Sequence, residues 1–290
     1  MKKLRYALEA VGLFIMLAIF SSLSAKNASN FGAWVGKKLS TRLGASKKAL
    51  RHISHALPDM ATEKQQAAIE GMWVNLAQVM AEYPHLETLG KSNVEIVGLE
   101  KLIELRDDGK AAIFFGAHCA NWEIASPAFY AHNLEMDLVY RAPNNPWADK
   151  MLDRMRSMKG KLRTYPKSTQ GTRQLVKAIK NGRHVGILID QKYNEGLPIP
   201  FFGIDAMTSP AFVQLAQKFE CPLIPTQVER IEKNNFRITL HSELKLFNED
   251  GTKKPIEPLI NEAHTHLESW IKATPTQWLW LHKRWGKNVS

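Results

Sequence analysis

Three polar residues stand close together in a stretch of the chain that is otherwise apolar. The segment FFGAHCANWEIASPAF, residues 114–129, contains His118, Asn121 and Glu123. If the chain turns back between them, the Glu123 carboxylate can accept one ring N–H of His118 and stabilise its imidazolium. The other ring nitrogen is then free to remove a proton from a substrate hydroxyl. The two residues therefore form a candidate general base that needs no protein nucleophile.

Other interpretations of this segment remain open. A histidine and a glutamate at this spacing can also be a helix-cap residue and a solvent-facing group. Asn121 can donate a hydrogen bond to a substrate, or it can cap the helix that we expect to begin near it. Cys119 is a candidate covalent nucleophile. Its pairing with His118 is disfavoured, because adjacent residues of extended backbone point to opposite faces.

The pattern along the chain predicts an α/β fold that places these residues at the end of a strand. Short β-rich apolar runs alternate with helical stretches, which is typical of a sheet with crossover connections. His118 and Asp190 each stand at the carboxyl end of such a run, where ligands of open α/β sheets bind. The four runs cover residues 93–98, 111–118, 136–142 and 184–190.

Two further patterns complete the predicted architecture. Residues 61–83 have apolar side chains at helical spacing and predict a long amphipathic helix. Residues 221–231 and 235–244 are two β-rich runs joined by a short turn, and they predict a hairpin. The central sheet is therefore expected to be mixed and to be flanked by helices. No repeat or long linker divides the chain, so we expect a single domain.

The N-terminus predicts a membrane anchor. Residues 10–23 are apolar and follow a basic start. A signal peptide is the alternative, but no convincing small-residue cleavage site follows the run. We predict a retained anchor helix over residues 1–25 and a catalytic domain over residues 26–290. Because a full span needs roughly 20 apolar residues, the anchor either crosses at a tilt or lies in the interface.

The charge of the chain points to acidic partners. Lys and Arg number 39 against 28 Asp and Glu, which gives a net charge of +11. More basic residues follow the apolar run than precede it, which places the main body on the cytoplasmic side and would hold it to anionic membrane lipid. The residues that follow the run are Lys26, Lys37, Lys38, Arg42, Lys47, Lys48 and Arg51.

A second basic stretch lies in the middle of the chain. It predicts a docking face for an acidic protein or for lipid headgroups, and a solvated helix and loop is the plain alternative. Its members are Lys150, Arg154, Arg156, Lys159, Lys161, Arg163, Lys167 and Arg173.

Several classes of site are not indicated. The two cysteines, Cys119 and Cys221, form no CxxC or metal-ligand pattern and suggest a reducing compartment. The histidines are scattered, and we find no zinc-finger, RNA-recognition or basic-zipper signature. We therefore expect no metal, nucleotide or redox cofactor and no nucleic-acid partner.

Four segments together resemble a known family. GAHCANWE resembles the H-x-x-x-x-D/E motif of glycerolipid-type acyltransferases, in the N-W-E form of the bacterial lipid A secondary (lauroyl/myristoyl-type) acyltransferases. One departure is Cys119-Ala120, where many members carry a large apolar residue and glycine. The other matching segments are YRAPNNPWADKMLDRMRSMKG (140–160), DQKYNEGLPIPFFGIDAMTSP (190–210) and PTQWLWLHKRW (275–285).

This resemblance implies an acyltransferase of the bacterial inner membrane. Members move a fatty acyl group from acyl carrier protein to a hydroxyl of an acyl chain on a lipid A precursor. His118 would be the general base, with Glu123 as its orienting partner. Arg141 would hold a lipid phosphate, and Asp190 would meet substrate or form an ion pair with an arginine. The candidate substrate-binding residues are Asn121, Arg141, Arg154, Arg156, Asp190 and Gln191.

Two rival functions follow from the same features. Acyl transfer to another phospholipid or glycolipid would use the same histidine chemistry. A noncatalytic membrane-binding protein needs only the anchor and the positive charge, but it leaves the polar motif at the strand end unexplained. The D-Q and C-terminal segments favour lipid A as the acceptor.

Overall fold

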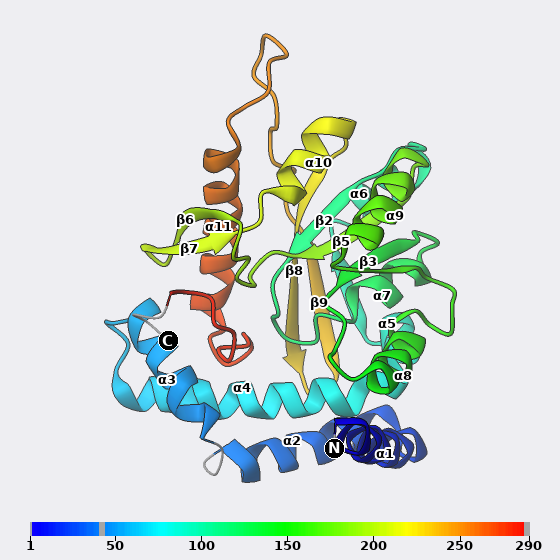
Figure 1. The fold of residues 1–290 in the computed structure, drawn as a ribbon, viewed down its shortest axis with the longest axis vertical. Coiled ribbons are helices and arrows are strands. Elements are labelled where there is room, and N and C mark those ends of the chain that lie inside the picture. Colours follow the sequence, from blue (N-terminus) through cyan, green and yellow to red (C-terminus); the bar gives the residue numbers. More distant parts are fainter. Residues whose placement is uncertain (1, 41–43, 287–290) are drawn as a thin grey trace.

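The computed structural model describes residues 2–40 and 44–286, and Figure 1 shows their arrangement. A seven-stranded sheet of order β1-β9-β8-β2-β5-β3-β4 forms the centre. The β8–β9 pair is antiparallel, and the other pairs are parallel. The strands are β1 Val94–Val97, β2 Ile113–Gly116, β3 Met136–Tyr140, β4 Thr164–Pro166, β5 His184–Leu188, β8 Leu223–Glu232 and β9 Asn235–Leu240.

Helices cover both faces of this sheet, so the predicted mixed α/β architecture is confirmed. A separate antiparallel pair, β6 Leu197–Phe201 and β7 Ile204–Thr208, packs beside the last helix. The helices are α1 Lys2–Ser22, α2 Ala25–Ser40, α3 Ala45–Ala56, α4 Thr62–Glu82, η1 Tyr83–His85, α5 Leu86–Ser92, α6 Leu99–Asp107, α7 Ala125–Ala131, α8 Pro146–Arg156, α9 Thr169–Lys180, α10 Ala211–Phe219 and α11 Ile256–Ala273.

Strand β2 lies in the middle of the sheet because every one of its side chains is apolar or absent. All four of its residues are buried, as expected for a parallel strand that is covered on both faces. Phe115 faces a core shared with α10 and α11. Phe114 faces a second core shared with α5 and α7. The end of β2, where the polar motif begins, is therefore fixed from both sides.

Helices α1 and α2 lie together at one end of the molecule, below α4 (Figure 1). Helix α1 is long and apolar enough to cross a membrane. Helices α2 and α4 pack closely at Gly36. If this residue had a Cβ, the atom would lie only 2.5 Å from the Trp73 carbonyl oxygen of α4. Trp34 of α2 is 59% exposed. Arg42, one of the basic residues noted above, lies outside the described residues.

Candidate active site

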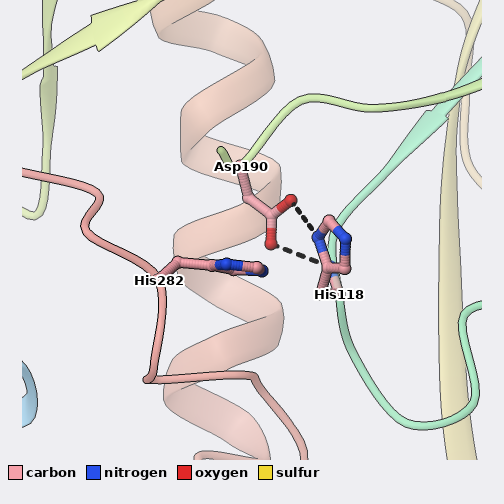
Figure 2. Close-up of side chains that lie close together, drawn as sticks. All are labelled: His118, Asp190 and His282. Atoms are coloured by element: carbon pink, nitrogen blue, oxygen red, sulfur yellow. Dashed lines mark hydrogen bonds and ion pairs between the residues drawn. The ribbon is translucent and has the colours of Figure 1, made fainter. Parts of the chain in front are cut away.

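His118 and Asp190 meet at the carboxyl end of the sheet. In the register of β2 and β5, Gly116 lies opposite Leu188, and each of the two polar residues follows its strand by two positions. The His118 Nδ1 atom lies 2.7 Å from Asp190 Oδ1. Figure 2 shows the carboxylate turned toward the imidazole ring, with the ring of His282 beside them.

The surroundings of Asp190 fix both its charge and the tautomer of His118. Its Oδ2 atom accepts bonds of 2.8 Å from the His118 backbone N–H and from Trp278 Nε1. Burial alone would raise the pKa of Asp190, but the charge and hydrogen bonds of His118 hold this pKa well below its usual value. The ionised carboxylate accepts the Nδ1–H of His118, so the lone pair lies on Nε2.

Gln191 supports this tautomer. Its Nε2 atom lies 3.3 Å from His118 Nε2, and an amide N–H can only donate, so the ring nitrogen accepts. His118 thus presents an unprotonated nitrogen to its surroundings, as a general base requires.

The predicted bond between the His118 ring and Glu123 is not observed. The Nδ1–H of His118 is bonded to Asp190 instead, and the Glu123 carboxylate binds other groups. The Glu123 carboxylate accepts two bonds of 2.9 Å from Arg156 and one from the Tyr83 hydroxyl. Burial opposes the ionisation of Glu123, but Arg156 outweighs it and lowers the pKa of this carboxyl. The ion pair with an arginine that we expected for Asp190 does not form among the described residues.

The turn after β2 explains the difference. Helix α7 begins at Ala125 rather than near Asn121, and Ala120 adopts a φ of 50°. Asn121 is fully buried, donates to Glu82 Oε2 over 2.8 Å, and accepts from the Glu123 backbone N–H. This geometry favours the structural role of Asn121 over substrate binding. It also directs Glu123 toward Arg156.

The C-terminal segment closes over this turn. The Leu279 N–H donates to the His118 carbonyl over 3.1 Å, and the Ala120 N–H donates to the Gln277 carbonyl over 2.9 Å. Ala120 thus holds a positive φ, a conformation that glycine adopts more readily than alanine. Trp278 and Trp280 are buried, so these tryptophans belong to the core rather than to an exposed apolar surface.

A cavity of about 290 Å³ opens beside His118. Its polar part is lined by His118, Glu123, Gln191 and His282, and Arg141 and Lys167 also border it. Arg156 lines the cavity as well, and its Nη1 atom is buried without a hydrogen-bond partner. Arg154 is exposed on α8 and does not line the cavity. The structure thus brings Arg141, Arg156, Asp190 and Gln191 to the site, and it leaves Arg154 outside.

Cys119 is poorly suited to covalent catalysis. Its side chain is 4% exposed, and burial together with the Asp190 charge raises the pKa of its thiol well above the usual value. The reactive thiolate is therefore disfavoured at neutral pH.

His282 is a site residue that the sequence analysis did not identify. Its ring centroid lies 4.5 Å from that of His118. Burial and the nearby His118 lower the pKa of His282 to about 3, so its ring is neutral at physiological pH. Ligand atoms of His118, Asp190 and His282 lie within 4.8 Å of one another, but both Asp190 oxygens already accept N–H bonds. This arrangement suits an oriented base better than a metal site.

A second buried histidine, His264, contacts Arg284 of the C-terminal segment. We expect it to make the stability of the protein depend on pH. His264 lies 2.7 Å from the Pro200 carbonyl and 3.0 Å from Arg284 Nη2. Burial and the Arg284 charge lower the pKa of His264 to about 4, from 6.5. Because the folded protein binds the proton less well than the unfolded chain, the stabilisation is complete above pH 6.5 and is lost as the pH falls toward 4.

We expect the free energy of unfolding to fall by about 3 kcal/mol across this window on account of His264. Urea unfolding at a series of pH values measures this free energy. Its dependence on pH should be weaker in His264→Gln than in the wild-type protein. An equal slope in this variant would exclude His264 as the source.

Comparison with known proteins agrees with these features. The family described as bacterial lipid A biosynthesis acyltransferase matches residues 1–287. The lipid A biosynthesis palmitoleoyltransferase of Escherichia coli (strain K12) is 23% identical over 269 residues, which cover 85% of this chain and 83% of the relative. The lipid A biosynthesis acyltransferase 2 of Shigella flexneri is 23% identical over 267 residues, 88% of this chain and 81% of the relative.

Among solved structures, the chain is similar to the 1-acyl-sn-glycerophosphate (LPA) acyltransferase PlsC from Thermotoga maritima. The identity is 12%, the TM-score is 0.41, and the match covers 96% of this chain and 100% of that one.

Proposed function

Because the chain belongs to the family of bacterial lipid A biosynthesis acyltransferases, we propose that it transfers a fatty acyl group from acyl carrier protein to a hydroxyl of a primary acyl chain on a lipid A precursor. The observation that carries the proposal is the His118–Asp190 contact of 2.7 Å. It orients a base whose unprotonated nitrogen faces a cavity that is lined by both cationic and apolar side chains.

In the proposed reaction, His118 Nε2 removes the proton of the acceptor hydroxyl as its oxygen attacks the thioester carbon. Asp190 keeps the ring in the correct tautomer and stabilises the imidazolium. The tetrahedral intermediate then expels the thiolate, which takes the proton back from His118. The Gln191 amide lies against Nε2, so it must move aside before the hydroxyl can reach this atom. The acceptor hydroxyl then takes the place of the amide as the hydrogen-bond donor to Nε2.

Glu123 and Arg156 have a supporting role in this mechanism. The Glu123 carboxylate holds Arg156 at the cavity by two hydrogen bonds of 2.9 Å. The unpartnered Nη1–H of Arg156 is a donor for a substrate oxygen in the cavity. We assign Arg141, exposed at the border of the cavity, to a phosphate of the acceptor.

The charged surface suits the proposed donor and location. Lys150, Lys159 and Arg163 are exposed, and the acidic carrier protein is the partner that such a surface attracts. Helix α1 would anchor the protein in the inner membrane, with residues 26–290 as the catalytic domain on the cytoplasmic side. Anionic lipid would bind the basic residues of α2 and α3.

Product mass tests this function. The full-length protein in detergent is incubated with acyl carrier protein thioesters and the tetra-acylated, sugar-bearing lipid A precursor. A mass gain of one acyl group is expected. A gain only with phospholipid acceptors would replace the proposed acceptor, and no gain with any acceptor would contradict acyl transfer.

A further inference from the structure

The cavity beside His118 has an apolar part, called the apolar limb below, whose lining includes side chains on the face of the sheet that carries Phe114. Met136, Leu138 and Tyr140 line it from β3, and alternate residues of a strand point to the same face. Met136 and Tyr140 lie four residue steps apart, which is about 13 Å at the usual rise of a strand. Phe114 lines the limb from β2. Phe114 and Met136 are each 2% exposed, so this part of the cavity is closed to solvent.

Two glycines on neighbouring strands create space in this limb. Gly116 and Gly186 both line the cavity, although glycine weakens a strand and often marks a place where another group approaches closely. The backbone itself explains Gly116, because its Cβ would lie 2.9 Å from the Thr226 carbonyl oxygen.

At Gly186, the three atoms nearest to an added Cβ all belong to side chains. The atoms nearest to a Cβ there are the ends of two flexible side chains, Met136 Sδ at 3.1 Å and Leu138 Cδ2 at 3.1 Å. Since these ends border the cavity, an added methyl group would push them into the limb. The absence of a side chain at Gly186 therefore keeps the limb open.

We propose that this limb holds the acyl chain of the donor thioester, and that Gly186 and Met136 set the longest chain it accepts. The proposal rests on the proposed function, because it places the thioester carbon at His118, where the apolar limb begins. The transferred chain is attached directly to that carbon and must leave the reacting centre along an apolar path. Arg141 borders the opposite, polar part of the cavity, which suits the phosphorylated acceptor.

The test compares chain-length preference in three variants. Gly186→Ala should shorten the limb, and Met136→Ala should lengthen it. Ile113→Ala is the matched control, because Ile113 is buried on the opposite face of the sheet and does not line the cavity. Thermal unfolding in detergent confirms that each variant is folded before it is measured.

Binding is measured first, without turnover, using pantetheine S-alkyl thioethers from octyl to octadecyl. Affinity should rise about fourfold per buried methylene and then stop rising at the length that fills the limb. This limiting length should decrease in Gly186→Ala, increase in Met136→Ala, and stay at the wild-type value in Ile113→Ala. The same limiting length in all four proteins would overturn the proposal.

Transfer is measured next, with mixed acyl carrier protein thioesters and acceptors that differ in primary chain length. The donor preference should follow the limiting length from the binding measurement. A change in acceptor preference with unchanged donor preference would assign the limb to the acceptor and overturn the proposal. If wild-type protein shows a limiting length in binding but transfers no acyl group, the proposed function fails and the assignment of the limb to an alkyl chain stands.

Discussion

Replacing Asp190 by asparagine should lower kcat by about 10³–10⁴-fold while leaving the fold intact. The Asp190 Oδ2 atom accepts two N–H bonds, from the His118 backbone and from Trp278. The single oxygen of an asparagine will stay with these two donors, which places its NH₂ group against His118 Nδ1. The ring proton must then move to Nε2, where the base needs its lone pair.

Steady-state kinetics with saturating acceptor measures this loss, and Asp137→Asn is the matched control. Asp137 is also fully buried, but it pairs with Arg183 and does not line the cavity. The control should lose stability and keep the kcat of its folded fraction. A folded Asp190→Asn protein with a kcat within threefold of wild type would show that Asp190 does not set the tautomer.

Replacing Arg156 by methionine should lower the free energy of unfolding by about 3–5 kcal/mol. Arg156 and Glu123 are 12% and 6% exposed, so the change leaves a nearly buried carboxylate with only Tyr83 as its hydrogen-bonding partner. The unpaired charge, rather than the lost attraction, causes most of the effect. Chemical denaturation at neutral pH measures it.

Two controls separate this effect from a general loss of arginine. The double variant Glu123→Gln/Arg156→Met removes the unpaired charge and should recover part of the stability. Arg237→Met breaks a surface pair with Glu95, whose side chains are 43% and 54% exposed, and should change stability by less than about 1 kcal/mol. If Arg156→Met is no more destabilising than Arg237→Met, the Glu123–Arg156 pair is not an important buried contact.

Strongly patterned elements of the fold were predictable from the sequence. The predicted helix over 61–83 corresponds to α4, and the predicted hairpin corresponds to β8 and β9. Strand β4 was missed because it has three residues and ends in a proline. Strands β6 and β7 were missed because the alternation in β6 is interrupted by prolines at positions 198 and 200.

The position of His118 at a strand end was also predictable, but the partner of its ring was not. Glu123 is near in sequence, whereas Asp190 is 72 residues away. Only the pairing of β2 with β5 brings Asp190 to the imidazole, and strand order follows from tertiary packing rather than from local pattern. His282 enters the site for a similar reason, since the C-terminal segment bonds to the turn after β2.

The role of His118 as the base is tested most directly by the initial rate of acyl transfer to the lipid A precursor, measured for wild-type protein and for a His118→Ala variant whose thermal stability matches that of the wild type. The product is quantified by mass spectrometry at equal enzyme concentration. The rate of the variant should be lower by at least about 10²-fold, the lower range for loss of a general base, and its binding of the alkyl thioethers should be retained. Transfer by the folded variant at the wild-type rate would contradict the assignment of His118 as the base.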